Sequence, residues 1–586
     1  MDKIKNRKII SIILSVAAII VAAVVAASCS GGGEAGQISG TPMVSDTAET
    51  PSGPVTLTGW FDYGTALYLR DKYKPGDKQS IEIQMAKNEK EGFEFVLFSS
   101  GDIEKVRCTV DALSDGNGHE LNGTVFVAWH IDVKKPAGIV RSKGFTPDPL
   151  LDQDNPYQGG SFDLIAKRAK TLYVQYVTDA DTVPGTYTGT LRIVHDGEEM
   201  LSGSVTVKVR DVYYDEKTEA AGLYQYGFAR YDTGAGGTGP DSAPDMDTGH
   251  YSQFVGIEVN EAERFALQQK YADYLLDNRM SPWHLPIKDA LLNEDQELVS
   301  KYMDNPRLSY TTIPNDPDLK KQYEAAEANG WLDKCCILYY DEPDTPEKYS
   351  TAESIGRQFQ AKFPSDNMIC PFSLAFTNSI RDMQPSMIER MSQFSKLHAP
   401  NAYTVMLVEG TYNTLMQLKK ERGDVILWYE AGYEPNEYVY VPHIYTSVPG
   451  VEKRIIFWQQ YLMDIDGFLY YQTTMWNRVA DFWDREYEDT EHPARPGMDI
   501  AEGGGVLMYW DPVTGDPIGS LSLESVRDGI EDFQLMKMAE KIIGRDGVME
   551  YVNRITTGLY DYTRDPDVLE QVKCELFDVV EGAANQ

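Results

Sequence analysis

Two adjacent acidic residues, Asp341 and Glu342, follow an apolar and aromatic stretch in the segment WLDKCCILYYDEP at residues 331–343. Carboxyl side chains can give and take protons, so such a pair could serve acid–base chemistry. The chain holds 90 Asp and Glu residues, however, and a DEP sequence can also begin an ordinary turn. The pair therefore needs a structural context before it indicates a catalytic site.

The element before the acid pair is predicted to be a buried strand. Cys335–Tyr340 is an apolar run of the kind found in parallel sheets, whose strands are covered on both faces. From residue 215 onward such runs alternate with amphipathic helices, and eight alternations predict a (β/α)8 TIM-type barrel over residues 215–586, with a helical tail. Active sites of such barrels lie at the C-terminal strand ends, and the acid pair would end the fourth strand. The predicted strands are Leu223–Phe228, Trp283–Pro286, Leu308–Ile313, Ile337–Tyr340, Met368–Leu374, Ala402–Leu407, Val425–Tyr429 and Gly467–Tyr471.

Several helix boundaries in this region are marked by their residue types. Asn260, with Glu263 three positions later, has the pattern of a capping box at a helix start. Thr345 is followed by a proline, which predicts an N-cap with proline at the first helical position. In the tail, which is predicted to be helical from Ser520 onward, Gly544 and Gly547 are expected to interrupt the helix.

The preceding segment, residues 55–214, has the pattern of a β-sandwich. Short runs alternate between apolar and polar residues and are separated by turn signals such as Pro184-Gly185, with hardly any helical period. This pattern predicts antiparallel sheets packed face to face. No catalytic constellation is found in the segment, so we expect a structural module that packs on the next domain.

The N-terminus has the pattern of an export signal. Basic residues precede an almost wholly apolar stretch, Ile9–Ala27, and small residues lead to Cys29. This arrangement resembles the lipobox of bacterial lipoproteins. It would make residues 1–28 a signal peptide, Cys29 the lipidated first residue and residues 29–54 a flexible linker. The apolar stretch is also long enough for an uncleaved membrane anchor. Either alternative predicts an extracytoplasmic protein held at the bacterial cell membrane.

The composition excludes some partners and leaves others open. With 54 Lys and Arg against 90 Asp and Glu, the formal charge is −36, so recognition of nucleic acid through a basic surface is not expected. The 8 histidines are scattered, and the cysteines after Cys29 form no CxxC or Cys/His cluster. We therefore expect no metal site, and we expect mostly buried free thiols in place of disulfides. These thiols are Cys108, Cys335, Cys336, Cys370 and Cys574.

Aromatic residues gather at the ends of the last predicted strands. Trp428 and Tyr429 end the seventh strand, Tyr471 ends the eighth, and Trp476 follows it. Flat apolar rings at a barrel mouth suit the C–H faces of sugar rings, although large aromatic residues are also ordinary core residues. Together with the acid pair, the set favours a carbohydrate site.

Four segments of the barrel region occur in an informative order. They are YYDEP, ILWYEAGYEP, EKRIIFWQQYLMDIDGFLYYQTTMWN and LESVRDGIEDFQLM. In this order they resemble the catalytic domain of glycoside hydrolase family 123, and also the wider family of related domains known as domain of unknown function 4091. AKNEKEGFEFVLFSS resembles the start of that family's N-terminal sandwich, so the resemblance runs from about Trp60 to about Ala539. The most specific segment is RDGIEDF at residues 527–533.

The resemblance implies an exported, retaining glycosidase that removes terminal β-linked N-acetylgalactosamine, with the sugar's own 2-acetamido oxygen as the nucleophile. By match of the YYDEP segment, Asp341 would stay ionised and hold the acetamide N–H. Glu342 would protonate the leaving oxygen and then activate water. No cofactor is implied, because the substrate supplies the nucleophile. The walls of the sugar pocket would be Trp428, Tyr429, Tyr471 and Trp476.

Other functions stay open at this point. The wider family leaves room for another sugar, and this chain departs from the family's usual Arg in Ser520–Glu524 and from its usual Pro-Gly turn at Asp511-Pro512. A surface lipoprotein could also bind glycans without cleaving them, although a pure binding site needs no general acid. A cell-wall scaffold protein is a third alternative, and fold alone does not separate the three. Within RDGIEDF, Arg527 and Asp528 are expected to form a structural charge pair.

Overall fold

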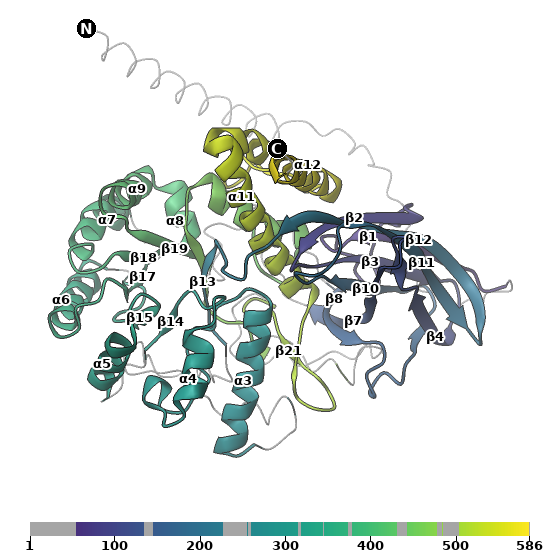
Figure 1. Ribbon diagram of the computed structural model, residues 1–586, viewed down its shortest axis with the longest axis horizontal. Coiled ribbons are helices and arrows are strands. Elements are labelled where there is room, and N and C mark those ends of the chain that lie inside the picture. The colour runs from purple at the N-terminus through teal and green to yellow at the C-terminus, as the bar shows by residue number, and fades with distance from the viewer. Residues whose placement is uncertain are drawn as a thin grey trace, which may run out of the picture. The chain divides into compact units, whose positions relative to one another are not determined.

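The computed structural model describes residues 54–133, 144–226, 255, 259–313, 318–343, 345–372, 378–430, 442–476, 483 and 503–584 (Figure 1). The predicted signal peptide, Cys29 and all but the last residue of the predicted linker lie outside the described residues. Within the described ranges, no helix is long and apolar enough to cross a membrane.

Two sheets form the N-terminal region, as the alternating sequence pattern predicts. One sheet is antiparallel throughout, in the order β1-β3-β10-β7-β8, and the other follows the order β2-β12-β11-β4-β9. In the second sheet β2 and β12 pair in parallel, which differs from the purely antiparallel prediction. The strands are β1 (Leu57–Tyr63), β2 (Ser80–Lys87), β3 (Lys90–Ser99), β4 (Ile103–Val110), β5 (Leu113–Ser114), β6 (Glu120–Leu121), β7 (Gly123–Val133), β8 (Gly144–Asp152), β9 (Phe162–Leu164), β10 (Ala169–Val177), β11 (Gly185–His195) and β12 (Glu198–Tyr213).

The core of this region follows from the period-two alternation of its strands. In β3, Phe93, Phe95 and Leu97 belong to one buried cluster that also includes residues of the second sheet, such as Ile193. Glu94 and the other intervening residues of β3 face the opposite side, because successive side chains of a strand point to opposite faces. One side of the first sheet is therefore free to pack against the C-terminal region.

After β12, short parallel strands alternate with helices. Five of them pair in the order β13-β20-β19-β18-β17, and three pair in the order β14-β15-β16. All pairings inside these two sheets are parallel. The strands are β13 (Ala221–Tyr224), β14 (Thr311–Thr312), β15 (Cys335–Leu338), β16 (Met368–Ile369), β17 (Pro371–Phe372), β18 (Leu397–Pro400), β19 (Val425–Glu430) and β20 (Gly467–Tyr470). A further hairpin consists of β21 (Tyr509–Trp510) and β22 (Pro517–Ile518). A regular (β/α)8 barrel is not established by these short strands and stays a prediction.

Helices surround the parallel strands in Figure 1. The predicted start signals are confirmed: Asn260 and Glu263 form a reciprocal capping box, and the Thr345 side chain accepts a hydrogen bond from the backbone of Lys348. These caps satisfy backbone N–H groups that a helix start otherwise leaves without partners. The helices are α3 (Glu261–Asp277), α4 (Gln296–Met303), α5 (Leu319–Asn329), α6 (Pro346–Lys362), α7 (Asn378–Met391), α8 (Ala402–Leu407), α9 (Glu409–Arg422) and α10 (Gly450–Leu462), with the short 3-10 helix η1 (Ala290–Leu292).

Two predicted strands differ from the structure. The segment Ala402–Leu407 was predicted to be the sixth strand, but it forms helix α8, and the strand is β18 before it. The Asn401 side chain accepts a hydrogen bond from the backbone N–H of Tyr403, and this cap starts the helix directly after the strand. The predicted second strand, Trp283–Pro286, is represented only by single parallel bridges of Pro282 and His284.

The C-terminal tail is helical, as predicted, and consists of α11 (Leu521–Ile555) and α12 (Pro566–Ala584). Gly544 interrupts α11 with a φ of 70°, whereas Gly547 continues the helix, so only the first of the two predicted interruptions is confirmed. The described cysteines are free, and four of the five are buried, in agreement with the sequence prediction.

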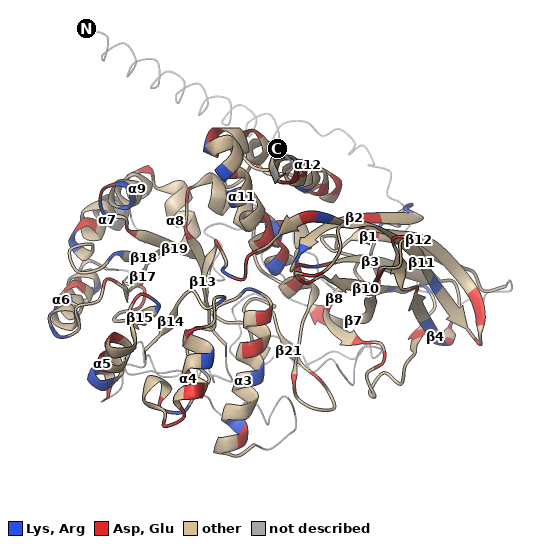
Figure 2. Cartoon of the chain, in the orientation of Figure 1, with Lys and Arg blue, Asp and Glu red and all other residues tan. Residues whose placement is uncertain are grey.

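The tail is joined to the rest of the chain by a buried ion network. Arg454 of α10 binds both carboxylate oxygens of Asp532 at 2.6 and 2.9 Å, and the Trp458 ring N–H donates to the same carboxylate at 2.8 Å. Lys573 of α12 forms an ion pair with Glu89 at 3.1 Å. Figure 2 shows charges of both signs along α11 near the N-terminal sheets. The network consists of Glu89, Glu91, Arg454, Glu524, Arg527, Asp528, Asp532, Glu570 and Lys573.

This network gives the charged residues of the segment RDGIEDF a structural role. Arg527 pairs with Asp528 at 2.7 Å, which confirms the predicted structural charge pair, and with Glu524 at 2.5 Å. Glu524 also accepts a hydrogen bond from Gln175 of β10 at 2.6 Å. The most specific segment of the sequence therefore holds α11 against the N-terminal sheets and does not itself form the acid pair's surroundings.

Candidate active site

Asp341 and Glu342 lie just beyond β15, at the C-terminal edge of the parallel strands. Both residues are exposed, whereas Tyr339 before them is buried. The backbone N–H of Glu342 donates to the carbonyl of Pro371 at 3.0 Å, which ties the pair to the neighbouring strand β17. The predicted position of the pair at a parallel strand end is therefore what the structure shows.

The backbone of Glu342 adopts an unusual conformation. Its φ is 39°, in the left-handed region that side chains with a Cβ rarely occupy. Such a conformation costs roughly 1–2 kcal/mol, and residues held in it concentrate at functional sites. The hydrogen bond from Glu342 to Pro371 is one contact that holds this geometry in place.

The side chain of Glu342 is held from a second strand. The hydroxyl of Tyr429, near the end of β19, donates a short hydrogen bond to Oε1 of Glu342. Tyr429 is only 2% exposed, and its ring packs in a cluster drawn from the parallel strands and Trp283. Burial, followed by the charge and the hydrogen bond of Glu342, raises the pKa of Tyr429 well above its usual value. The tyrosine hydroxyl therefore keeps its proton and acts as the donor.

The environment of Asp341 raises its pKa to about 6, mainly by desolvation and secondly through the neighbouring charge of Glu342. The residue as a whole is nevertheless exposed. Among the described residues, neither acid forms an ion pair with Lys or Arg. The family resemblance implies an ionised Asp341, whereas its surroundings here raise its pKa and favour the protonated form.

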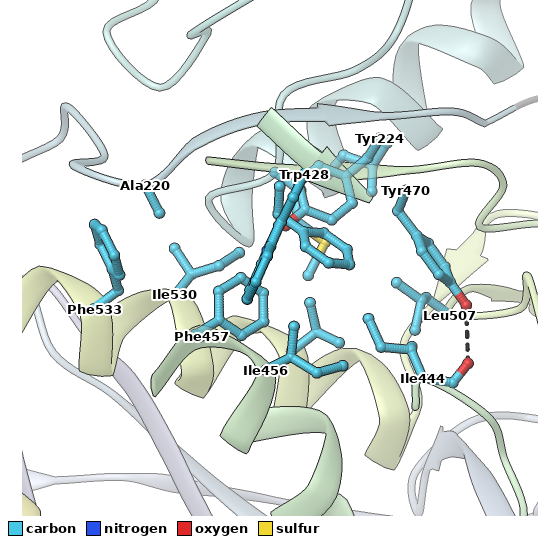
Figure 3. Close-up of a cluster of buried hydrophobic side chains, with 14 of the residues drawn as sticks. Ala220, Tyr224, Trp428, Ile444, Ile456, Phe457, Tyr470, Leu507, Ile530 and Phe533 are labelled. Carbon is cyan, nitrogen blue, oxygen red and sulfur yellow. Dashed lines mark hydrogen bonds between the residues drawn. The ribbon is translucent and has the colours of Figure 1, made fainter. Parts of the chain in front are cut away.

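The structure separates the four predicted aromatic wall residues. Trp428 is 1% exposed and lies on the opposite face of β19 from Tyr429, among helix residues such as Phe457 and Ile530 (Figure 3). Consecutive residues of a strand face opposite sides, so Trp428 and Tyr429 cannot both face one pocket. Trp428 is therefore a packing residue in this structure, and its predicted place in a sugar pocket is corrected.

Trp476 is also buried in the core. Its ring is 0% exposed, its N–H donates to the carbonyl of Met508 at 2.9 Å, and it packs against Trp510 with ring centroids 4.8 Å apart. Tyr471 differs, because it is partly exposed directly after β20 and packs on the ring of Tyr470. Of the predicted wall residues, Tyr471 is the one that the structure leaves accessible.

Other polar groups at this strand edge were not predicted from the sequence. His284 pairs with Thr312 across the two neighbouring segments and stacks on Tyr226 with ring centroids 4.7 Å apart. Burial lowers the pKa of His284 to about 4, so its ring is neutral at physiological pH. Glu430 ends β19 and contacts the ring of buried His443 at 2.7 Å. A histidine inside the predicted strand Trp283–Pro286 was the available sequence signal for His284, whereas the partner of Glu430 lies 13 residues away.

The described residues contain no group of three or more His, Cys, Asp or Glu side chains that could hold a metal ion. The arrangement instead offers two carboxyl groups with different surroundings. One belongs to an exposed residue and has a pKa raised to about 6, and the other is held at a fixed position by a buried tyrosine. Groups arranged in this way can divide the stabilisation of charge and the transfer of a proton between them.

This chain is similar to known proteins in part of its sequence and in its fold. The family model of the glycoside hydrolase 123 catalytic domain matches residues 274–539, which include the acid pair. Among solved structures, a family 123 glycoside hydrolase from Clostridium perfringens, described in connection with glycolipid glycan hydrolysis, shows a similar fold. Its TM-score is 0.61 at 11% identity, over 90% of this chain and 97% of that chain. A family 39 glycoside hydrolase from Bacteroides cellulosilyticus has a TM-score of 0.26 at 12% identity, over 72% of this chain and 80% of that chain. A comparison with curated protein sequences found no match.

Proposed function

We propose that this chain is a glycosidase that removes terminal β-linked N-acetylgalactosamine with retention, by substrate-assisted catalysis. Its residues 274–539 match the model of the glycoside hydrolase 123 catalytic domain, and a family 123 structure has a similar fold. The observation that supports this proposal most strongly is the acid pair inside the matched segment. Glu342 is held at a strained strand end by Tyr429, and exposed Asp341 lies beside it.

The first chemical step breaks the bond between the anomeric carbon and the leaving oxygen. The oxygen of the substrate's 2-acetamido group attacks the anomeric carbon, and Glu342 gives its proton to the leaving oxygen. Asp341, in its ionised form, accepts a hydrogen bond from the acetamide N–H and thereby offsets the positive charge that develops on the resulting oxazolinium ring. The hydrogen bond that this N–H donates to Asp341 also favours the ionised carboxylate, so substrate binding lowers the pKa of Asp341 from its raised value.

The second step reverses these roles. Water attacks the anomeric carbon, the bond to the acetamido oxygen breaks, and Glu342 takes the proton that water releases. The configuration at the anomeric carbon is therefore inverted once in each step, and the product keeps the β configuration. Partly exposed Tyr471 offers an aromatic face for the sugar.

We further propose that the parallel strands belong to one (β/α)8 barrel. The single parallel bridges Tyr224–Pro282 and His284–Thr312 connect the five-stranded sheet to the three-stranded one. β16 and β17 are separated only by Cys370, which would close the ring at its other side. The strand cluster that contains Leu223, Cys336 and Tyr429 would then be the barrel interior.

The proposal also includes a substrate class and a cellular location. The solved relative is described in connection with glycolipid glycan hydrolysis, so we propose that the terminal N-acetylgalactosamine belongs to a glycolipid glycan. The lipobox-like sequence before Cys29 supports export and a lipid anchor at the bacterial membrane, with residues 55–214 and 215–586 as the sandwich and catalytic domains. A lipid anchor would place the enzyme outside the cytoplasm, where host or environmental glycans occur.

The test compares aryl glycosides of β-N-acetylgalactosamine, β-N-acetylglucosamine and β-galactose with the full chain in detergent. We expect cleavage of the first, and no cleavage of β-galactosides, because they lack the acetamido nucleophile. Proton NMR of the first-formed sugar should show the β anomer. Cleavage of galactosides at a similar rate, or release of the α anomer, would contradict substrate assistance. Cleavage of N-acetylglucosaminides alone would keep the mechanism and change the sugar.

A further inference from the structure

Tyr429 is fixed in position by the strands around it. On one side its strand pairs it with Leu469 of β20, and on the other side it bridges Asn401 after β18. Its ring is buried in the strand cluster that also holds Leu427 and Leu469. The ring therefore has little freedom, and its hydroxyl reaches the edge of the strands at one defined point.

Glu342 is fixed at its backbone by a different contact. Its N–H bonds to Pro371, and its φ of 39° sets the direction in which the side chain leaves the backbone. What remains free in Glu342 is the rotation of its own side chain. The hydrogen bond from Tyr429 to Oε1 removes most of that freedom.

We propose that Tyr429 is a positioning residue for Glu342 and not a wall of the sugar pocket. The hydroxyl holds Oε1, which leaves Oε2 as the oxygen that carries the proton exchanged with the leaving group and with water. This inference rests on the proposed role of Glu342 as general acid and base. It assigns to Tyr429 a task that the sequence analysis, which placed it in the pocket wall, did not foresee.

The chemistry of the hydrogen bond supports this task. When Oε2 gives its proton to the leaving oxygen, the electron pair of the O–H bond stays on the carboxylate and spreads over both oxygens. A hydrogen bond to an ionised carboxylate is stronger than one to a neutral carboxylic acid. Tyr429 therefore stabilises the ionised carboxylate that Glu342 becomes during the first step. This extra stabilisation ends in the second step, when Glu342 takes a proton from water.

The variant Tyr429→Phe tests this inference, because it removes the hydroxyl and keeps the buried ring. Tyr470→Phe is the matched control: Tyr470 lies on the adjacent strand and is 0% exposed, and its hydroxyl donates to the carbonyl of Ile444 at 3.0 Å. Both variants lose one buried strand-end hydroxyl, but only the first loses a contact with Glu342. Thermal unfolding of both variants reports whether either fold has changed.

The decisive readout is the dependence of kcat/KM on the leaving group. Poor leaving groups need protonation by Glu342, whereas 2,4-dinitrophenolate leaves without it. For Tyr429→Phe we expect a loss of about 10–100-fold on substrates with alkyl or unsubstituted phenyl leaving groups, as for loss of a hydrogen bond to a charged group, and less than about threefold on the dinitrophenyl glycoside. Tyr470→Phe should show no such dependence. An equal loss on all leaving groups would assign Tyr429 to sugar binding and overturn the inference.

A second measurement does not depend on activity. In protein with ¹³C-labelled glutamate carboxyls, the Glu342 signal is identified by its absence in Glu342→Gln. At one fixed pH, the chemical shift of this signal should change in Tyr429→Phe, because Oε1 has lost its hydrogen bond, and should stay as in wild type in Tyr470→Phe. An unchanged chemical shift in Tyr429→Phe would show that Tyr429 does not act on Glu342, even if the enzyme cleaves β-N-acetylgalactosaminides. Conversely, a wild-type chain that cleaves none of the test sugars would contradict the proposed function, while a changed chemical shift would still confirm the hydrogen bond.

Discussion

The ion network around α11 and the acid pair after β15 use the same residue types in opposite ways. In the network, Arg454 meets Asp532 at 2.6 Å and Glu570 at 2.7 Å, and all three are buried. Burial by itself would lower the pKa of Arg454, but the two carboxylates raise it well above its usual value. At the acid pair, by contrast, desolvation and a like charge act together and raise the pKa of Asp341 to about 6, although the residue lies exposed at the strand edge.

The difference shows how the surroundings divide charged residues between structure and chemistry. A buried charge with an opposite partner stays ionised and holds two elements together. When the partner is removed, the remaining buried charge is uncompensated and destabilises the fold. An acid next to another acid changes its protonation within the working range of pH, which a catalyst requires. Three measurements test this difference between the two regions.

The largest effect is expected in the ion network. Asp532→Ala leaves Arg454 buried without its bidentate partner and removes the acceptor of the Trp458 ring N–H. We expect the free energy of unfolding to fall by roughly 3–5 kcal/mol. Denaturant unfolding measures the change. Glu575→Ala is the control, because Glu575 pairs with Arg554 on the surface and should contribute no more than about 1 kcal/mol. Equal losses in the two variants would contradict the contrast.

The next effect concerns the pH dependence of activity. In the proposed mechanism, Asp341 holds the acetamide in its ionised form, and its pKa in the free enzyme is raised to about 6. We therefore expect kcat/KM to fall about tenfold per pH unit below this value, since kcat/KM reports the free enzyme. In Asp341→Asn the residual activity should lack this acidic limb. A wild-type profile that stays flat down to pH 4.5 would show that the charge of Asp341 is not required.

The smallest effect concerns stability at the acid pair. Because the folded state raises the pKa of Asp341, its protonated form favours folding, and that contribution is lost as pH rises from about 4 through about 6. Asp341→Asn mimics the neutral form. We expect a slightly higher Tm than wild type at pH 7.5 and no difference at pH 4, measured by thermal unfolding. A lower Tm at pH 7.5 would mean that the ionised carboxylate has a stabilising partner.

The local patterns of the sequence identified the parts of the fold that depend on neighbouring residues. The capping box at Asn260, the cap at Thr345 and the strand before Asp341 all rest on residues a few positions apart, and the structure contains them. The segment of helix α8 has the pattern of a strand because five of its six residues are apolar and the helix is too short to show a helical period. The cap at Asn401 was the signal that could have corrected this.

The candidate site shows where local patterns are insufficient. Alternation along β19 implies that Trp428 and Tyr429 face opposite sides, but it does not say which side carries the site. That choice depends on α10 and α11, whose residues cover Trp428. The partners in the ion network are also far apart in the sequence: Lys573 pairs with Glu89, and 484 positions separate the two residues. Only the folded chain brings such residues together.

The central claim is that the acid pair performs catalysis without holding the fold together. The most direct test measures kcat/KM and Tm of Glu342→Gln on an aryl β-N-acetylgalactosaminide with a poor leaving group. The amide keeps an oxygen that can accept the hydrogen bond of Tyr429, but it cannot give a proton. We expect kcat/KM to fall by about 10²–10⁴-fold with a Tm close to that of wild type. Retained activity, or a large fall in Tm, would contradict the claim.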